Sequence, residues 1–422
     1  MTMNVRVALA ACAAGALVGP GAAWAQGDPL EGQQTLQREV VVREVLARNP
    51  DLEAMRQAAQ MAQARVRQEG TLMDPMLSLE VAPLSLFSSH HRKGVAVSLQ
   101  QQLPFFGKRA LQRETAQAQA AGAEQDAEGA RLQMALEASA MFDDWYVVHR
   151  ALEVNAHHVQ MMEEIKRAAE LQYGVGMGSQ QDPLVAEVEL ARMERDRLML
   201  EAEQRMIRAR LNAMLRRSPD ALLPPPPGQL ADLPALDADA SALREEALSA
   251  RPELKALRAR LGGTEAMVAL AKKSWLPDVT VMAEYSSMWE APQHQVMAGV
   301  MLNLPVQVGM RRGMQEEAAA DAARMRAEEQ ARIDAIVADV DVALAQLTEA
   351  RRALTLHRER LVPAAESQLA AARVAYEAGK RELMFLIEAE NDLRELQLQR
   401  HIAEADVHRR TAARHRALGR LP

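Results

Sequence analysis

Two kinds of hydrophobic pattern alternate along this chain. Short stretches in which apolar and polar residues alternate with a period of two occur in two pairs, at 76–102 and 279–304, and predict β-strands. Each pair is followed by a run, at 105–172 and 308–376, in which apolar residues and alanines recur every three or four positions. Such a run predicts a helix far longer than those of ordinary globular domains. The pattern therefore predicts a mainly helical chain with a small β part.

Shorter helical patterns flank each strand pair and long helix. They are predicted at 38–71, 183–217, 240–274 and 383–418. At a rise of 1.5 Å per residue, a long helix spans about 100 Å and a shorter one about 50 Å, so two short helices placed end to end match one long helix. Each unit is thus predicted to form a long antiparallel hairpin, with strands at one end and a turn at the other.

The long helices carry seams of apolar residues with the spacing of a coiled coil. The seam of the first consists of Met134, Ala138, Met141, Trp145, Val148, Leu152, Asn155, Val159 and Met162. Asn155 is its one polar member. In the second long helix, Pro363 removes an intrahelical hydrogen bond and is expected to kink the helix.

The chain contains the same unit twice. The segment ARNPDLEAMR matches SARPELKALR, and the tips LQYGVG and VAYEAG end at Gly176 and Gly379, with an offset of about 201 to 203 residues throughout. A proline-rich segment joins the two copies. The predicted parts are a signal peptide at 1–25, a first repeat at 26–220 with its tip near 173–182, a linker at 221–239, and a second repeat at 240–422 with its tip near 376–385.

Alternation in the strands separates an apolar face from a polar one. The apolar positions include Leu77, Leu79, Val97, Leu99, Val281, Tyr285, Val300 and Leu302, and the polar ones include Ser78, Glu80, Ser98, Gln100, Thr280 and Glu284. One face suits lipid and the other water, and each strand is close to the roughly ten residues that cross a bilayer when tilted. Because open strand edges are not tolerated in hydrocarbon, four strands would have to share a barrel with other chains. A small soluble sheet packed on a helix is the alternative.

Composition and the N-terminal sequence indicate the cellular compartment and exclude several classes of function. Aromatic residues make up 3% of the 422 residues, and no stretch after the N-terminus offers about 18 consecutive apolar residues. Arg6, an apolar run and Ala23-Trp24-Ala25 form the pattern of a cleaved signal peptide. The only cysteine, Cys12, lies in a sequence like a lipoprotein box, but too few apolar residues precede it for lipidation to be expected. The sequence shows no catalytic constellation, phosphate loop or basic stripe, so we expect no enzyme, no cofactor and no nucleic-acid partner.

Several segments resemble the TolC-like outer-membrane efflux protein family. They are LQQQLPFFGKRALQRE, NLPVQVGMRRGMQEEA and the tips YGVGMGSQQDPLVAEVEL and YEAGKRELMFLIEAENDL, which are similar in particular to the heavy-metal (CzcC/CusC-like) branch. The resemblance implies a homotrimer, with a twelve-stranded barrel in the outer membrane and a helical tunnel across the periplasm. It also implies an exit duct that works with a periplasmic adaptor and an inner-membrane transporter of the RND class. Many members of the branch are lipoproteins, and we expect this chain to differ from them in that respect.

The resemblance assigns roles to residues at the two tips. It places Tyr173 and Gly176, and again Tyr376 and Gly379, where the adaptor docks. The alternative is that each glycine only ends its helix and lets the chain reverse.

Acidic residues just past the tips are candidates for a gate. These are Asp182 and Glu187 after the first tip, and Glu388 and Glu390 after the second. Family ducts close at this end with rings of acidic side chains, and the resemblance matches Glu388 to one of them. Three copies of a carboxylate around a pore would concentrate cations. Asp182 is alternatively the N-cap of the following helix, with Pro183 as the first helical residue.

The cargo is the least determined part of the prediction. The resemblance favours heavy-metal cations, and a drug or organic-solute duct of the same fold is one alternative. A periplasmic adaptor or soluble coiled-coil scaffold is the other. The adjacent histidines His90 and His91 could ligate a metal, but no fixed ligand set accompanies them, so we expect an ordinary surface loop there.

Overall fold

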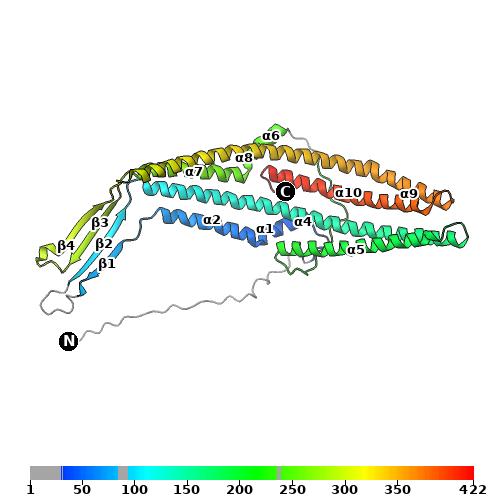
Figure 1. Cartoon of the computed structure of the whole chain (residues 1–422), viewed down its shortest axis with the longest axis horizontal. Coiled ribbons are helices and arrows are strands. Elements are labelled where there is room, and N and C mark those ends of the chain that lie inside the picture. The colour runs from blue at the N-terminus through cyan, green and yellow to red at the C-terminus, as the bar shows by residue number, and fades with distance from the viewer. Residues whose placement is uncertain (1–29, 31, 84–93, 235–238) are drawn as a thin grey trace, which may run out of the picture.

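The computed structural model describes residues 30, 32–83, 94–234 and 239–422. The predicted signal peptide at 1–25, with Cys12, and the histidines His90 and His91 lie outside the described residues. The described chain is elongated, with a sheet at one end and two helical tips at the other (Figure 1).

Helices make up most of the described chain. The first half contains α1 (Arg38–Arg48), α2 (Pro50–Glu69), α4 (Lys108–Gly174) and α5 (Gln181–Met214). The second half contains α6 (Ala240–Ala250), α7 (Pro252–Lys273), α8 (Val308–Leu356), a π-turn η2 (His357–Leu361), α9 (Val362–Glu377) and α10 (Leu383–Ala417). The order of short helices, strand pair, long helix and final helix therefore occurs twice.

The leading short helix of each half is broken in two, so the single helices predicted at 38–71 and 240–274 were wrong at one point each. The breaks fall at Asn49 and Arg251, whose ψ angles of 125° and 124° are extended. Each residue precedes a proline, and the proline ring disfavours the α conformation in the residue before it. Asn49 then caps α2, because its side chain accepts hydrogen bonds from two N–H groups of the first turn.

The two long helices differ in continuity. The first, α4, is unbroken over 67 residues. The second is interrupted by η2, and Pro363 is the second residue of α9 directly after it. A π-turn shifts the helical hydrogen-bond register by one residue, so the missing N–H of the proline falls where the ladder is already altered. A π-turn thus lies just before Pro363, and the kink predicted there stays a prediction.

The helices lie side by side in a definite order. α4 is central, with α2 and α5 along one side and α7 and α10 along the other (Figure 1). α8 packs on α7 and α10 and forms the far side. Pairs of shorter helices thus run end to end along the long ones, which is the arrangement that the helix lengths predicted.

The strands form one antiparallel sheet. Its order is β1 (Met76–Val81), β2 (Val95–Leu103), β3 (Val279–Ser286) and β4 (Val296–Leu302), with a short 3-10 turn η1 (Pro292–His294) before β4. The sheet follows the helices, since β1 leads from α2 and β4 leads into α8 (Figure 1). The sheet and the helical layer therefore have the same two open sides. We call the side of β1 the first side and the side of β4 the last side.

The register confirms the predicted faces of the sheet. Leu79 lies opposite Val97, and Val97 lies opposite Tyr285. Opposed residues of an antiparallel sheet share a face, so the apolar side chains point the same way. On the other face, Ser78 Oγ and Ser98 Oγ lie 2.7 Å apart and share a hydrogen bond. The apolar face is uncovered within the described chain, where Val300 is 68% exposed.

The predicted seam of α4 lies in the core. Ala138, Trp145, Val148 and Met162 are buried, the first three against α1 and α5 and the last against α9 and α10 near the tips. Asn155 is also buried, and its Nδ2 donates to the backbone oxygen of Met193 on α5, 3.2 Å away. Alanine and glycine dominate the contact of α4 with α7, which brings these two helices close together.

Two neighbouring glycines of α7 give a matched test of that contact. A Cβ at Gly262 would meet nothing within 4 Å, whereas a Cβ at Gly263 would lie 2.8 Å from the Cβ of Ala118 on α4. We expect Gly262→Ala to raise the melting temperature, because alanine is favoured over glycine in a helix by about 0.8–1 kcal/mol. Gly263→Ala should lower it, because overpacking costs about 1–3 kcal/mol. Thermal unfolding followed by circular dichroism measures both, and shifts of the same sign would contradict the close approach of α4 and α7.

Candidate functional site

The two sides of the molecule carry unpartnered apolar surface. On the first side, α5 exposes Leu184, Val188, Leu198, Met199 and Met206. On the last side, α8 and α9 expose Val342, Leu356 and Val374. These exposed apolar residues follow the length of both outer helices, so each side offers apolar surface to a neighbouring molecule.

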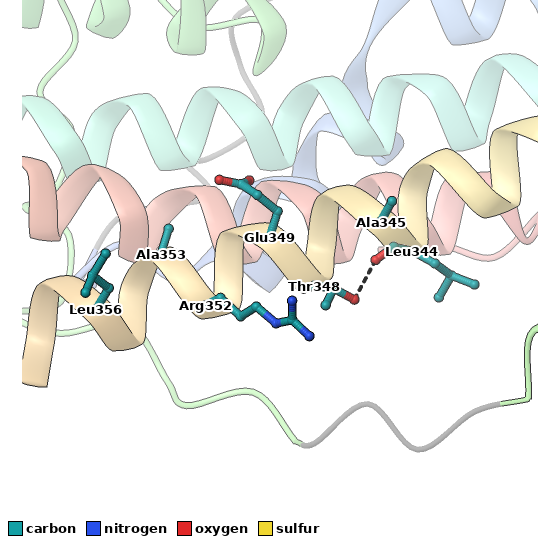
Figure 2. Close-up of a pocket in the computed structure, with 7 residues that line it drawn as sticks. All are labelled: Leu344, Ala345, Thr348, Glu349, Arg352, Ala353 and Leu356. Carbon is teal, nitrogen blue, oxygen red and sulfur yellow. Dashed lines mark hydrogen bonds between the residues drawn. The ribbon is translucent and has the colours of Figure 1, made fainter.

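A shallow groove on α8 illustrates this unpartnered side. Figure 2 shows the seven residues that line it, all of them on α8 between Leu344 and Leu356. Thr348 satisfies its own hydroxyl by donating to the backbone oxygen of Leu344, 2.8 Å away. No second element of the described chain contributes to the lining, so this face of α8 is free to contact another molecule.

Both tips use the same backbone device to end a helix. Gly176 and Gly379 have φ angles of +74° and +67°, a conformation that glycine adopts without steric cost. At the first tip, Met177 N–H donates to Gln172 O and Gly176 N–H donates to Tyr173 O. Matching bonds surround Gly379. These are Schellman motifs, in which the tyrosine of each Tyr-x-x-Gly element supplies a carbonyl and the glycine closes the helix.

The two tip tyrosines have different surroundings. Tyr173 is 48% exposed, whereas Tyr376 is buried, and its hydroxyl has no hydrogen-bond partner in the described chain. Burial, followed by the charge of Asp182, raises the pKa of Tyr376. Gln172 Nε2 donates to the backbone oxygen of Tyr376, 3.3 Å away, and so ties one tip to the other. A cleft of about 300 Å³ lies beside Tyr376 between α4, α9 and α10.

Three of the four predicted gate acids lie in partly or fully solvated positions near the tips. Glu388 is exposed on α10, and Glu187 is exposed on α5 with Lys166 Nζ 3.5 Å from its carboxylate. Asp182 is half-buried. It is not the N-cap, because α5 begins one residue earlier, at Gln181; its carboxylate instead accepts from the backbone N–H of Ser179 at 3.4 Å.

The fourth acid, Glu390, was wrongly predicted to face a pore. Its side chain is fully buried between α10 and α4, where it lies 2.5 Å from His158 Nδ1. His158 Nε2 lies 3.1 Å from the side-chain oxygen of Gln397. Glu390 follows the buried Leu383 and Ile387 at helical spacing, and this periodicity in the sequence would have placed it on the packed face. The polar link joins the first hairpin to the second.

The middle of the molecule holds a group of polar residues that no sequence motif predicted; most are buried, and Arg358 lies at the exposed edge. Arg38 of α1 forms an ion pair with Asp143 of α4, and Tyr146 Oη donates to Glu404 of α10 at 2.9 Å. Burial raises the pKa of Asp143 to about 7, against the opposing charge of Arg38. Burial also favours a high pKa at Glu404, but hydrogen bonds from His401, Arg358 and Tyr146 outweigh it and lower the pKa to about 2. We call Arg38, Asp143, Tyr146, Arg358 and Glu404 the waist network.

Within the described ranges, no group of three or more His, Cys, Asp or Glu side chains is placed to hold a metal ion. None of the described helices combines the length and the apolar character that crossing a membrane requires.

Comparison with known proteins identifies the family. The sequence profile of the outer membrane efflux protein family matches residues 41–215 and 243–420. The chain belongs to the outer membrane efflux protein family. It is therefore an efflux channel protein of the outer membrane that extends into the periplasm, and the alternative of a periplasmic adaptor or soluble scaffold does not hold. No curated protein matches the chain in sequence.

Solved structures share the fold. The outer-membrane channel OprN is 19% identical, with a TM-score of 0.77 over 95% of this chain and 97% of that chain. CusC is 16% identical, with a TM-score of 0.78 over 91% and 92%. VceC from Vibrio cholerae is 18% identical, with a TM-score of 0.76 over 91% and 96%. The predicted fold class is confirmed. The TM-scores to OprN, CusC and VceC are nearly equal, so they do not assign the chain to the CusC-like branch of the family.

The contribution of the buried His158–Glu390 pair to stability can be measured with His157, an exposed neighbour, as the control. We expect His158→Leu to lower the melting temperature strongly, because it leaves the buried carboxylate of Glu390 without its partner, a loss that typically costs about 3–5 kcal/mol. His157→Leu is the matched control, since His157 is adjacent but exposed. Circular dichroism during heating measures both variants. If the two variants unfolded at the same temperature, the His158–Glu390 link would not stabilise the packing of α4 on α10.

Proposed function

We propose that three copies of this chain build the outer-membrane exit duct of a tripartite efflux system. Each copy would contribute four strands to a twelve-stranded barrel and its helices to a tunnel across the periplasm. The observation that carries the proposal is that the sheet and the helical layer are open at the same two sides. The duct conducts passively what a periplasmic adaptor and an inner-membrane RND transporter deliver to it.

The copies can form a closed ring because the two open sides of each copy are different. The side formed by β1, α2 and α5 differs from the side formed by β4 and α8, so the last side of one copy meets the first side of the next. Such head-to-tail contacts form a ring when the rotation between copies closes. One rotation then pairs the open strand edges and covers the exposed apolar residues of α5 and α8 together.

The two-repeat organisation supports the same duct. We propose that 26–220 and 240–422 are two copies of one unit, joined by the linker at 221–239. Each unit supplies one strand pair and one long hairpin. The match of the family profile in two segments, 41–215 and 243–420, supports this division.

The tips have the features of a docking surface for the adaptor. Tyr173, Val175 and Met177 are exposed at the first tip. Each lies next to one of the glycines at the end of α4. The second tip offers the cleft beside Tyr376. We therefore keep Tyr173, Gly176, Tyr376 and Gly379 as the proposed docking elements, with the two glycines shaping the backbone.

Glu388 is the acid that we propose for the gate. It is exposed on α10 near the tip, whereas Asp182 is held in the first turn of α5 and Glu187 lies beside Lys166. Three copies of Glu388 around the duct axis would attract cations through their summed negative potential.

The proposed gate predicts a change in ion selectivity. Glu388→Gln should lower the preference for cations in planar-bilayer recordings, since a trimer loses three charges near the constriction. Glu395→Gln is the control, because Glu395 is also exposed on α10 but lies about two turns farther from the tip. Unchanged selectivity in Glu388→Gln, or an equal change in both variants, would place the constriction elsewhere.

The proposed lipid-facing surface of the sheet can be tested on one strand. Val300→Arg should reduce the yield of assembled trimer, because an arginine on the lipid face costs roughly 2–4 kcal/mol near the bilayer midplane. Met301→Arg is the control, since Met301 is the next residue of β4, is also exposed, and points to the opposite face. Unheated gel electrophoresis of outer-membrane fractions measures the trimer. Equal losses in the two variants would refute the assignment of faces.

We propose heavy-metal cations as the cargo, on the resemblance of the strand–helix junctions and tips to the CzcC/CusC-like branch. The presence of CusC among the proteins of the same fold is compatible with this cargo. A duct needs no tight metal site, because conduction requires weak binding that releases the ion. Drugs or other organic solutes are the second candidate cargo.

The cargo proposal predicts a selective loss of tolerance. Deletion of the gene should sensitise cells to a transition-metal cation such as copper, silver, zinc or cobalt, while the purified protein binds that metal weakly. His90→Ala with His91→Ala should leave tolerance intact. Minimum inhibitory concentrations measure both effects. Sensitivity confined to organic drugs would assign the chain to drug efflux without changing the fold.

A further inference from the structure

Basic residues gather where the helices meet the sheet. We call six of them the basic collar: Lys108, Arg109, Lys272, Lys273, Arg311 and Arg312. They lie at the ends of α4, α7 and α8 that face the strands (Figure 1). The strand–helix junctions together with the adjoining ends of α4, α7 and α8, at 70–76, 103–112, 272–279 and 302–312, hold these six cations and two carboxylates, Asp74 and Asp278. Their net charge is +4, although the net charge of the whole chain is −7.

Hydrogen bonds from two collar residues join the ends of the three helices. Lys273 Nζ of α7 donates to the backbone oxygen of Phe106, which lies just before α4, at 3.0 Å. Arg311 Nε of α8 donates to the backbone oxygen of Ser274 at the end of α7, at 2.9 Å. Hydrogen bonds thus connect the end of α7 to the starts of both long helices.

Most of the positive charge in the collar is not neutralised. Lys108 Nζ lies 2.8 Å from the carboxylate of Asp278, and it is the one collar residue that forms an ion pair within the described chain. Arg109, Lys273 and Arg311 donate to backbone carbonyls, which are neutral. Lys272 and Arg312 are exposed to solvent. Arg311 is buried, so Lys272 and Arg312 form the exposed positive surface that an anion could compensate.

Stabilisation of the helices explains only part of the collar. Lys272 and Lys273 lie in the last turn of α7, where a cation is favourable to the helix dipole. The other two pairs lie near the N-termini of α4 and α8, where a cation is unfavourable, and neither helix has an acidic residue in its first turn. Four of the six cations are thus placed where the helix dipole does not favour them. Asp278 compensates Lys108, and backbone carbonyls accept from Arg109 and Arg311, so Arg312 is the one of the four left exposed to an anion outside the chain.

Exposed apolar residues lie directly beside the collar. Phe106 is 88% exposed and Val306 is 76% exposed, and both stand between the last strand residue and the first helical turn. The apolar face of the sheet continues from them away from the helices. Aromatic and aliphatic side chains followed at once by cations match the boundary of a bilayer, where acyl chains give way to phosphate groups.

We propose that the basic collar binds the phosphate groups of anionic phospholipids in the periplasmic leaflet of the outer membrane. The inference rests on the proposed function, which places the sheet in that membrane. A phospholipid bound there would lay its acyl chains along the apolar strands and its headgroup against Lys272 and Arg312. The lipid would then set the depth of the duct in the membrane at the point where strands turn into helices.

The test compares two exposed collar residues with two exposed basic residues elsewhere. Fluorescent phosphatidylglycerol and phosphatidylcholine are titrated into the full-length protein in detergent, and dissociation constants are measured at low and high salt. The collar variant is Lys272→Gln with Arg312→Gln. The control is Arg167→Gln with Arg332→Gln, two exposed residues far from the sheet. A charge-conserving variant, Lys272→Arg with Arg312→Lys, separates loss of charge from misfolding.

We expect the protein to prefer phosphatidylglycerol, and the collar variant to bind it at least about fivefold more weakly at low salt, the effect of one cation at an acidic lipid surface. The control and the charge-conserving variant should bind as the original chain does. Equal affinity for the two lipids, equal losses in collar and control variants, or displacement of the lipid by millimolar inorganic phosphate would overturn the inference. Unheated gels of the same samples report the trimer, whose absence in the original chain would contradict the proposed function instead.

Discussion

Unpaired backbone edges are the constraint on which the form of this protein depends. Within the described residues, a sheet of four antiparallel strands leaves the outward edges of β1 and β4 without a neighbouring strand, and hydrocarbon offers no hydrogen-bond partners. The strands are too few to close on themselves around a channel. Because α2 and α5 lie on the side of β1 and α8 on the side of β4, any contact that pairs the strand edges also covers the exposed helix faces. In the proposed duct, the membrane part and the periplasmic part would therefore assemble through the same contact between copies.

The helical layer combines close packing with a few polar links between hairpins. Along α4 and α7, glycine and alanine allow the helices to approach closely. A Cβ placed on Gly263 of α7 would lie only 2.8 Å from the Cβ of Ala118 on α4. Toward the tips the packing becomes aliphatic, and the buried pair of His158 and Glu390 joins α4 to α10. At the waist network, Tyr146 and Glu404 make a second link between the same helices. Buried polar contacts of this kind fix one relative position of the hairpins, because a shift would leave the groups unsatisfied.

Periodicity alone predicted most of the fold. A period of two located the strands and their faces, and the length of the helical runs predicted the end-to-end pairing along α4. The breaks before Pro50 and Pro252 interrupt a helical hydrophobic pattern that continues on both sides of them, so the prolines are their only signal in the sequence. Glu390 is acidic and lies near a tip, as a gate residue would, but its helical spacing from Leu383 and Ile387 places it on the buried face of α10. The waist network could not be predicted, since Arg38 and Asp143 are 105 residues apart and meet only after the helices have packed.

The most direct test is cross-linking between opposite edges of the sheet. The only cysteine, Cys12, falls in the predicted signal peptide, so cysteines can be introduced at Leu79 of β1 and at positions along β4 from Val296 to Leu302. A short bismaleimide applied to outer membranes should convert the double-cysteine chain into covalent species up to a trimer and no larger, while each single-cysteine chain stays monomeric in denaturing gels. A ladder that stops at the dimer in the double variant, or that continues beyond three copies, would contradict the head-to-tail ring of three.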